Sequence, residues 1–267
     1  MRRADGTAIV TRMSGKLPLS LCVITRDAAG QLADCLGSAP FAAEIVVVDS
    51  GSRDDTVEIA RRCGARVVVQ PWLGFGPQKN FAVAQAAHDW VLCLDADERV
   101  TPELDASIRS ALAGAPVAAA FAIARRNRFL GRWLRHGEGY PDWIVRLFDR
   151  RRARWTDDAV HENVAVAGPV ARLDGDLLHA SAESLDAYVA KQNRYTTLQA
   201  AAMHANGERA GAVRLVGAPL ARFLRFYVVK LGFLDGVPGL VHIAIGCFAS
   251  FLKYAKLRAL RTTESRP

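Results

Sequence analysis

Short apolar runs alternate with polar, helix-compatible segments over the first hundred residues of the chain. Four runs have the length and composition of buried strands: 19–25, 44–48, 66–70 and 90–94. The segments between them predict helices: 31–36, 57–63 and 78–87. Strands that alternate with helices at this spacing favour a parallel α/β sheet with right-handed crossovers.

The stretch 91–100 is the most informative in the chain. Its first four residues are apolar, as in a strand buried on both faces, and Asp95, Asp97 and Glu98 follow immediately. Ligands of open α/β sheets bind at the carboxyl ends of the strands, and two aspartates separated by one residue suit a divalent cation that carries phosphates. Helix capping is the alternative interpretation, because a helix is predicted to begin at Thr101.

Asp49 occupies the corresponding position after the second predicted strand. A carboxylate just beyond a sheet edge can accept hydrogen bonds from a ribose hydroxyl or a base N–H, but an ordinary Asx turn explains the same residue. The first strand is not followed by G-x-G-x-x-G, and no G-x-x-x-x-G-K-[ST] occurs. The sequence therefore does not support a dinucleotide-binding or P-loop site.

Composition and charge narrow the function only slightly. With 267 residues, 51% of them hydrophobic, the chain can bury the core of one large domain with an appendage. Its formal charge of +8 indicates an anionic partner, either nucleic acid, a phosphorylated substrate or an acidic membrane surface. The five cysteines lack C-x-x-C spacing, which argues against a disulfide framework or a zinc site and favours the cytoplasm.

Four blocks of sequence share an order and spacing with a known family. They are Thr25-Arg26-Asp27, the Val-Val-Val-Asp-Ser-Gly-Ser run within 46–56, Gln78-Lys79-Asn80, and 90–99 with its Asp-Ala-Asp-Glu. Together they resemble the inverting family 2 glycosyltransferases of GT-A fold. Four later segments resemble the subgroup that builds the lipopolysaccharide core, including the β-1,4-glucosyltransferases that act on heptose: 140–142, 145–148, 160–162 and 178–179.

The resemblance covers about residues 18–260 and implies an α/β, GT-A fold with a mainly parallel sheet flanked by helices. It implies a nucleotide-sugar donor, with UDP-glucose favoured. Thr25 and Asp49 would then contact the nucleoside, and Lys79 falls where the family places a basic residue near the nucleotide.

The resemblance also implies a Mg²⁺ or Mn²⁺ cofactor. Asp97 corresponds to the usual direct ligand of this metal, and Asp95 to the residue that contacts the metal, directly or through water, or the donor's ribose. His179 sits where many GT-A enzymes keep a histidine close to the metal or the diphosphate.

Glu162 aligns with the carboxylate that deprotonates the acceptor hydroxyl in the family. It lies in 159–164, whose alternation predicts a strand with His161 on one face and Glu162 on the other. Three other carboxylates compete for this role: Asp157, Asp158 and Glu183. The first two favour a solvated turn, and the third favours a helix start.

Basic and aromatic residues are mixed in 125–135 and 146–154, after an apolar strand candidate at 117–124. Such a mixture suits single-stranded nucleic acid, but no RNA-binding motif accompanies it, so we expect no nucleic-acid partner. A phosphorylated, membrane-bound saccharide acceptor explains these residues better. A solvated rim around a β-hairpin is the structural alternative.

The composition changes again from Pro219 onward. Aromatic and basic residues precede 237–252, which is almost wholly apolar but shorter than the ~20 residues of a spanning helix. Two helices joined at 235–239 fit this pattern. Attachment to an anionic inner-membrane surface is the favoured interpretation, ahead of a buried helical pair or dimer surface and of a true span.

These observations predict a domain organisation and a function. We expect a flexible leader at 1–17, a glycosyltransferase domain at 18–217 with its nucleotide half ending near 100, and a helical extension at 218–267. The predicted protein is cytoplasmic and peripheral on the inner membrane face, and moves a hexose to a lipopolysaccharide-core or other lipid-linked acceptor. A sugar-phosphate nucleotidyltransferase and a non-catalytic, membrane-attached binding protein are the alternatives; the oligomeric state stays open.

Overall fold

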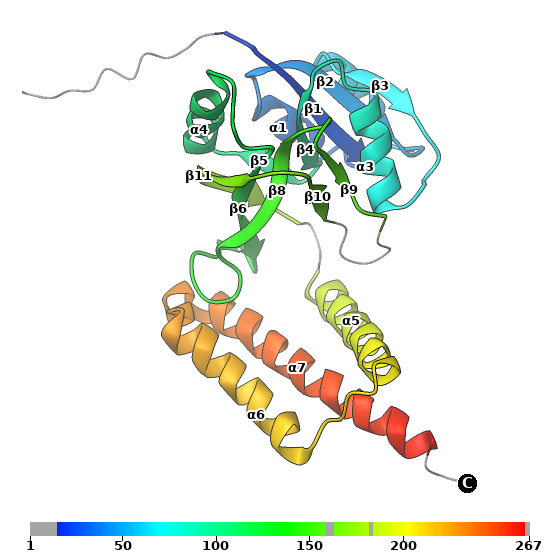
Figure 1. Ribbon diagram of the computed structural model, residues 1–267, viewed down its shortest axis with the longest axis vertical. Coiled ribbons are helices and arrows are strands. Elements are labelled where there is room, and N and C mark those ends of the chain that lie inside the picture. Colours follow the sequence, from blue (N-terminus) through cyan, green and yellow to red (C-terminus); the bar gives the residue numbers. More distant parts are fainter. Residues whose placement is uncertain (1–14, 158–162, 182–183, 265–267) are drawn as a thin grey trace, which may run out of the picture. The chain divides into compact units, whose positions relative to one another are not determined.

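The computed structural model describes residues 15–157, 163–181 and 184–264 (Figure 1). Its strands are β1 (Leu17–Thr25), β2 (Ala42–Asp49), β3 (Arg66–Val69), β4 (Trp90–Asp95), β5 (Glu98–Val100), β6 (Ala120–Phe129), β7 (Arg132–Trp133), β8 (Asp142–Asp149), β9 (Ala153–Trp155), β10 (Val164–Val166) and β11 (Val170–His179). Its helices are α1 (Leu32–Gly37), α2 (Thr56–Arg62), α3 (Phe75–Ala84), α4 (Pro102–Leu112), α5 (Leu185–Ala205), α6 (Ala212–Phe223), η1 (Leu224–Val229), η2 (Gly232–Asp235) and α7 (Gly236–Glu264).

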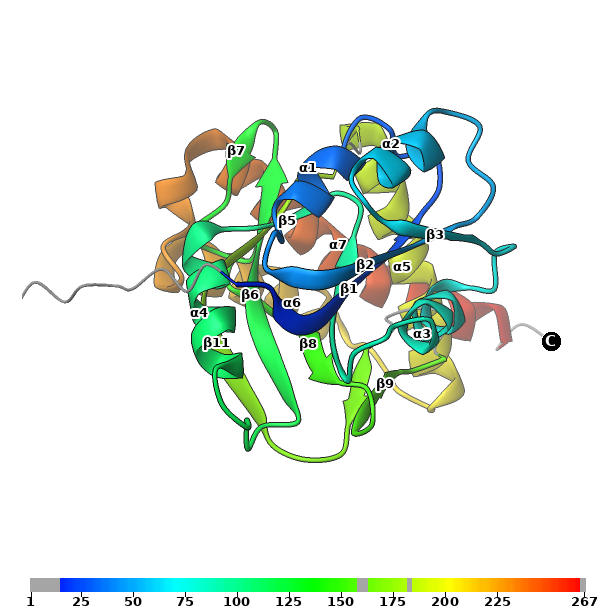
Figure 2. The ribbon, with the colours of Figure 1, turned by 90° about the horizontal axis from the view of Figure 1, so that it is seen from above.

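The main sheet has the strand order β3-β2-β1-β4-β8-β6-β11-β5, and β7 pairs with β6. Strands β3, β2, β1 and β4 run parallel, with Thr25 of β1 in register with Asp49 of β2. Strand β8 then pairs with β4 in the antiparallel direction. Figure 2 shows α1 and α2 on one face of the parallel strands and α3 on the other. The α/β fold class predicted from the alternation of strands and helices is confirmed.

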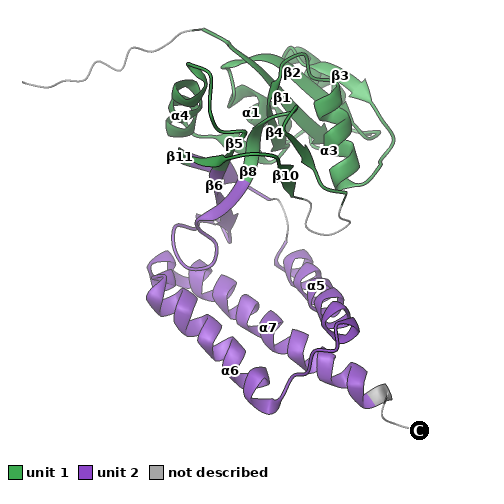
Figure 3. Cartoon of the chain, viewed as in Figure 1, with its two compact units in different colours: residues 1–122, 145–175 green, residues 123–144, 176–267 purple. Residues whose placement is uncertain are grey.

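The chain divides into two compact units, which Figure 3 shows in different colours. Unit 1 contains the chain up to Ala122 together with Val145–Gly175, and unit 2 contains Ile123–Ile144 and the chain from Asp176 onward. One core cluster of unit 1 lies between α3 and the strands, and is formed by aliphatic, sulfur-containing and aromatic side chains such as Val46, Cys93 and Phe148.

Three helices dominate unit 2, where α5 and α6 both pack on α7 (Figure 1). Ala200, Tyr254 and Leu257 are buried among them. The prediction of two C-terminal helices is confirmed by α6 and α7. Their predicted junction at 235–239 is too late in the chain, because η1 ends at Val229 and α7 begins at Gly236. Pro238 is accommodated there, since the first turn of a helix needs no N–H donor from it.

Two predicted elements have boundaries that are wrong by three residues or more. Helix α3 begins at Phe75 rather than residue 78, although the Gly and Pro residues before 78 predict a loop there, and it ends at Ala84 rather than residue 87. Pro77 lies in its first turn, where proline is compatible with a helix. Strand β6 starts at Ala120, three residues later than predicted, and continues into the basic segment up to Phe129.

Gly76 shows how tightly α3 approaches the end of β9, and it generates a stability prediction. A Cβ at this position would collide with the carbonyl oxygen of Thr156. We expect Gly76→Ala to lower the free energy of unfolding by about 1–3 kcal/mol in urea titrations, because the backbone must shift.

Gly217→Ala is the matched control, since a Cβ there meets no described atom within 4 Å and the residue lies inside α6. Alanine should stabilise this helix by about 0.5–1 kcal/mol. Equal effects of the two substitutions would contradict the close approach of α3 and β9.

Candidate active site

The carboxyl ends of β1 and β2 form the first part of the site. Asp49 is buried, and its Oδ2 accepts hydrogen bonds from the backbone N–H groups of Gly51 and Ser52, each at 2.9 Å. Its Oδ1 accepts one from the Ser52 hydroxyl. Asp49 therefore forms the Asx turn that the sequence allowed, and its contact with a nucleoside stays a prediction. Beside it, the Thr25 hydroxyl oxygen is buried and has no hydrogen-bond partner among the described residues.

Hydrogen bonds join the loop that follows β1 to the loop that follows β2. The Asp27 N–H donates to the Ser52 hydroxyl at 2.8 Å, and the Arg53 N–H donates to the Asp27 carboxylate at 2.7 Å. The next residue, Ala28, donates its N–H to the hydroxyl of Thr56, the first residue of α2, at 2.8 Å. Asp27 adopts φ = 51°, a left-handed conformation that asparagine and aspartate tolerate better than most residues. Two of the four sequence blocks thus build one loop pair.

The Gln78-Lys79-Asn80 block distributes its side chains to three places. Gln78 donates to the Ser50 hydroxyl at 3.0 Å, next to Asp49. Asn80 forms reciprocal hydrogen bonds with the backbone of Trp155, at 2.9 and 3.0 Å. Between them, buried Lys79 points to the end of β4. All three residues lie in the first two turns of α3, so the helix sets their directions.

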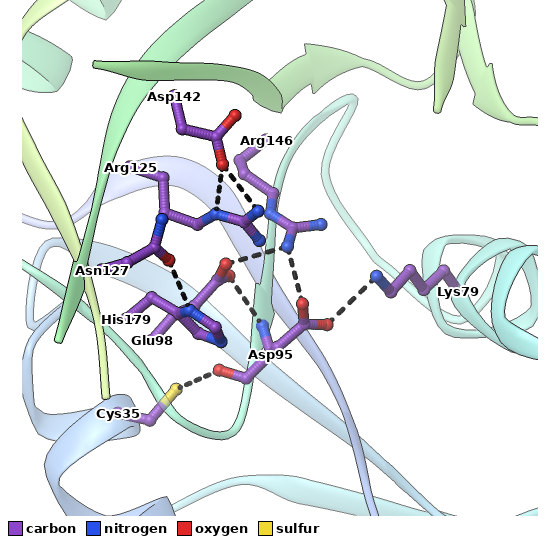
Figure 4. Close-up of polar contacts among 9 residues, drawn as sticks. All are labelled: Cys35, Lys79, Asp95, Glu98, Arg125, Asn127, Asp142, Arg146 and His179. Carbon is purple, nitrogen blue, oxygen red and sulfur yellow. Dashed lines mark hydrogen bonds and ion pairs between the residues drawn. The ribbon is translucent and has the colours of Figure 1, made fainter. Parts of the chain in front are cut away.

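Asp95 at the end of β4 lies between two cations (Figure 4). Lys79 Nζ is 3.1 Å from Oδ1, and Arg146 Nη2 is 2.6 Å from Oδ2. Arg146 also pairs with Glu98, whose carboxylate is fully buried, at 2.8 Å. Glu98 in turn accepts the N–H of Asp95 at 3.0 Å. These contacts join two carboxylates and two cations around one strand end.

The ring of Trp155 completes this network. Lys79 Nζ lies 4.4 Å and the Arg146 guanidinium carbon 5.3 Å from its centroid. Both cations therefore combine a carboxylate partner with an aromatic neighbour in a largely dehydrated setting, where such contacts are strongest.

Burial and charge shift the pKa values of two groups here. Burial alone would lower the pKa of Arg146, but Asp95 and Glu98 raise it above the ordinary value, so the guanidinium is permanently charged. Burial first, and then Glu98, Asp95 and Asp97, raise the pKa of the Cys35 thiol. The thiol is protonated and lies 3.4 Å from the Asp95 carbonyl oxygen, a structural position rather than that of a nucleophile.

Asp97 lies in the turn between β4 and β5 and is partly exposed. In the part of the chain that the structure describes, no group of three or more His, Cys, Asp or Glu side chains converges on one point. Magnesium in phosphate-transfer sites is usually bound through one or two carboxylates plus substrate phosphates. Asp97 and Asp95 offer carboxylate donors of this kind at the carboxyl end of β4, where both oxygens of Asp95 also contact Lys79 and Arg146.

His179 belongs to unit 2, at the end of β11. Its Nδ1 is 2.7 Å from Asn127 Oδ1 on β6. Because the amide oxygen can only accept, Nδ1 is the donor in this hydrogen bond. Histidines that bind metals commonly show this arrangement, in which a second residue orients the ring.

Unit 2 also holds a compact anchor for the segment between β7 and β8. The Tyr140 hydroxyl donates to Asp176 at 2.7 Å, and Asp176 forms an ion pair with Arg126. Burial, and then Asp176, raise the pKa of Tyr140, which is therefore a hydrogen-bond donor. Arg125 makes a two-nitrogen contact with Asp142, at 3.0 and 2.7 Å. Two arginines of the basic segment 125–135, Arg125 and Arg126, thus hold the chain between β7 and β8 in place.

The predicted base, Glu162, lies outside the described residues, as do the competing candidates Asp158 and Glu183. Asp157 is described and exposed. The site residues that the structure brings together are Lys79 and Asp95, which are in contact, and Thr25 and Asp49, which are adjacent in register.

The sequence did not predict three residues of this network. Arg146 and Glu98 are the missed partners of Asp95, and Trp155 is the aromatic neighbour of Arg146. Glu98 was part of the strand-end motif, but its full burial indicates a structural carboxylate rather than a surface ligand. Arg146 lies in the 145–148 segment that resembles the lipopolysaccharide subgroup and at the start of the basic segment 146–154, but neither pattern indicates a partner for Asp95. Nothing in the sequence indicates that β8 runs beside β4.

Comparison with known proteins identifies the relatives of this chain. Residues 20–182 match the family model described as Glycosyl transferase family 2. The lipopolysaccharide core biosynthesis glycosyltransferase LpsC of Rhizobium meliloti is 31% identical, over 96% of this chain and 97% of its own length. An uncharacterized glycosyltransferase of Rickettsia prowazekii is also 31% identical, over 91% and 87% of the two chains.

Solved structures give weaker similarities. Glucosyl-3-phosphoglycerate synthase of Mycobacterium tuberculosis, in complex with Mn²⁺, UDP and glucosyl-3-phosphoglycerate, has a TM-score of 0.36 and 23% identity. The alignment covers 42% of this chain and 44% of that one. A mycobacterial protein has a TM-score of 0.47 and 18% identity, over 69% and 74% of the two chains.

The buried network predicts a large effect of removing its cation. Arg146→Met leaves the carboxylate of Glu98 buried beside Asp95 without its counter-charge. We expect the free energy of unfolding to fall by about 3–5 kcal/mol, measured by urea titration. Adding Glu98→Gln should recover part of this loss, because the amide oxygen can still accept the Asp95 N–H without a buried charge.

Arg61→Met is the matched control, since Arg61 forms an exposed ion pair with Glu58 on α2. Pairs of this kind contribute at most about 1 kcal/mol. If Arg146→Met cost no more than this control, the network would not be a major source of stability.

Proposed function

The chain belongs to the family 2 glycosyltransferases, and from this premise we propose that it transfers a hexose from a nucleotide-sugar donor to a saccharide acceptor by inversion. The observation that carries the proposal is the strand edge of unit 1. Thr25, Asp49 and Asp95 end the parallel strands β1, β2 and β4, and Lys79 of α3 contacts Asp95. This is the edge at which open α/β sheets bind nucleotides.

The nucleoside of the donor is assigned to Thr25 and Asp49. Support comes from the Thr25 hydroxyl, which is buried without a hydrogen-bond partner in the described part of the chain. Buried polar groups of this kind are rare unless a ligand or water satisfies them. Asp49 holds the loop beside Thr25 through hydrogen bonds from Gly51 and Ser52. A carboxylate has about four acceptor positions, so Asp49 can also accept a hydrogen bond from a nucleoside.

The donor's diphosphate is assigned to the Asp95–Asp97 turn. Asp97 would bind Mg²⁺ or Mn²⁺ directly, with Asp95 and His179 as further candidates for contact with the metal or the phosphates. The bound cation would offset the negative charge that develops on the departing diphosphate. Lys79 and Arg146 hold the Asp95 carboxylate in one orientation, which favours a preorganised site.

The acceptor step needs a base. One bond forms between the acceptor oxygen and the anomeric carbon, the bond to the diphosphate oxygen breaks on the opposite face, and the hydroxyl proton passes to a carboxylate. We assign this base to Glu162 on the resemblance described above. The relative LpsC, whose name places it in lipopolysaccharide core biosynthesis, supports a lipopolysaccharide-core or other lipid-linked acceptor, and the resemblance favours UDP-glucose as the donor.

Such an acceptor would place the enzyme on the cytoplasmic side of the inner membrane, as a peripheral protein. Residues 232–262 are long and apolar enough to cross a membrane by length and composition, and 22% of the most apolar window is buried. The exposed apolar side chains of this segment, such as Val237 and Phe248, support membrane association.

The metal assignment is tested by Asp97→Asn. With each candidate donor and Mn²⁺, we expect the wild type to show a thermal shift and slow release of nucleoside diphosphate, and the variant to lose at least about 100-fold of the release rate. Asp89→Asn is the matched control, because Asp89 precedes the opposite end of β4. Full activity of the wild type in excess chelator would exclude the metal, and release of pyrophosphate would indicate a nucleotidyltransferase.

The base assignment is tested by Glu162→Gln. We expect unchanged donor binding and a loss of about 10²–10⁴-fold in transfer to acceptor, because only proton removal is affected. Asp157→Asn and Glu183→Gln serve as controls, since both carboxylates competed for this role. Near-normal transfer by Glu162→Gln would assign the base elsewhere.

A further inference from the structure

Helix α6 and the π-helix η1 present an apolar surface that nothing in the described part of unit 2 covers. No residue of α6 or η1 is buried. Exposed aliphatic side chains recur at the three- and four-residue spacing of one helix face: Val213, Val216, Leu220, Leu224 and Val228. Soluble monomers rarely leave a contiguous apolar stripe of this length in water.

The surface continues past the end of η1. Val229 is 74% exposed, and Leu231, Phe233 and Leu234 in and before η2 are also exposed. Leu231 has φ = 55°, so the chain reverses there and displays its side chain at the turn between η1 and η2. The helical stripe and this turn are joined end to end along the chain, and we call them together the α6–η2 surface.

The charges of this region have one sign. From Arg209 to Thr263 the sequence contains one acidic residue, Asp235. That carboxylate is buried, and it accepts the backbone N–H groups of Arg135 and His136 at 2.9 and 2.8 Å. The basic residues of the same stretch include Arg225 and Lys230, which are exposed on or next to η1. Any partner of the α6–η2 surface therefore meets positive charge from this stretch.

Helix α7 is tied into the bundle at several points. Lys256 donates to Thr196 and Thr197 of α5, at 2.7 and 2.8 Å, and Tyr254 and Leu257 are buried. Near its other end, the His242 ring lies against Tyr188 of α5, with Nε2 at 3.1 Å from the hydroxyl. These contacts would be lost if α7 left the bundle to cross a bilayer, whereas α6 can meet a membrane without losing any buried contact.

We propose that the α6–η2 surface is the part of this protein that binds an anionic lipid bilayer, with the aliphatic stripe inserted at the interface and Arg225 and Lys230 at the headgroups. The proposal rests on the membrane location in the proposed function and assigns it to named residues. Exposed apolar residues flanked by bases, in a stretch whose one acidic residue is buried, are the chemistry that anionic membranes select. A second copy of the chain would bring equal positive charge to the same place, which disfavours a dimer.

The test is sedimentation of the full-length chain with vesicles of phosphatidylcholine alone and of phosphatidylcholine mixed with phosphatidylglycerol. We expect binding to the mixed vesicles only, weakened by salt. Val216→Glu with Val229→Glu should reduce the apparent affinity about 100-fold, because each valine loses about 10-fold when it can no longer insert. Arg225→Gln with Lys230→Gln should reduce it by about 5-fold per charge at low salt.

The matched control is Val117→Glu with Val170→Glu, which adds the same charges at exposed valines of unit 1. It should bind vesicles like the wild type. Equal binding to both vesicle types, or unchanged binding of the Val216/Val229 variant, would overturn the proposal. So would a dimer, detected by light scattering, that this variant dissociates while vesicle binding stays the same.

Donor hydrolysis is measured on the same preparations without vesicles. Retained hydrolysis in the Val216/Val229 variant, together with lost vesicle binding, supports the surface and shows that the variant is folded. If the wild type binds anionic vesicles as expected but hydrolyses no nucleotide sugar, the proposed donor chemistry fails and the surface stands.

Discussion

The ion-pair network around Asp95 is the interaction on which the candidate site depends. Lys79 and Arg146 each contact one oxygen of the Asp95 carboxylate at the end of β4. Arg146 also pairs with the fully buried carboxylate of Glu98. A buried charge is costly unless it is paired and hydrogen-bonded, so none of these groups can be placed independently of the others. The geometry of the strand end is therefore set by residues from β4, β5, β8 and α3.

This network links the parallel part of the sheet to its first antiparallel strand. Arg146 comes from β8, which pairs with β4 in the opposite direction, and Trp155 follows in β9. Asn80 binds the backbone of Trp155, while its neighbour Lys79 reaches Asp95. A short helical block thus positions both the aromatic ring and one cation against the same carboxylate, which explains why three consecutive polar residues occur on a partly buried helix.

Most of the nucleotide-side fold was predictable because it depends on local pattern. Buried parallel strands read as continuous apolar runs, and the polar residues that end them mark the edge where side chains gather. The start of α3 was predicted wrongly, since Gly and Pro suggest a loop although both are compatible with the first turn of a helix. The surface of α6 was partly foreseen as an aromatic and basic segment, but its exposed stripe depends on which face packs on α7.

The sequence by itself determined the α/β class, the family resemblance and the edge of the sheet that carries Asp49, Asp95 and Asp97, because hydrophobic period and short motifs are properties of neighbouring residues. Only the tertiary structure decided that Arg146 forms buried ion pairs with both Glu98 and Asp95, and that the Asp49 carboxylate accepts three hydrogen bonds within its own turn. These contacts join positions up to 51 residues apart, or depend on local backbone geometry. Pairing of strands and burial of charge are collective, so no local pattern specifies them.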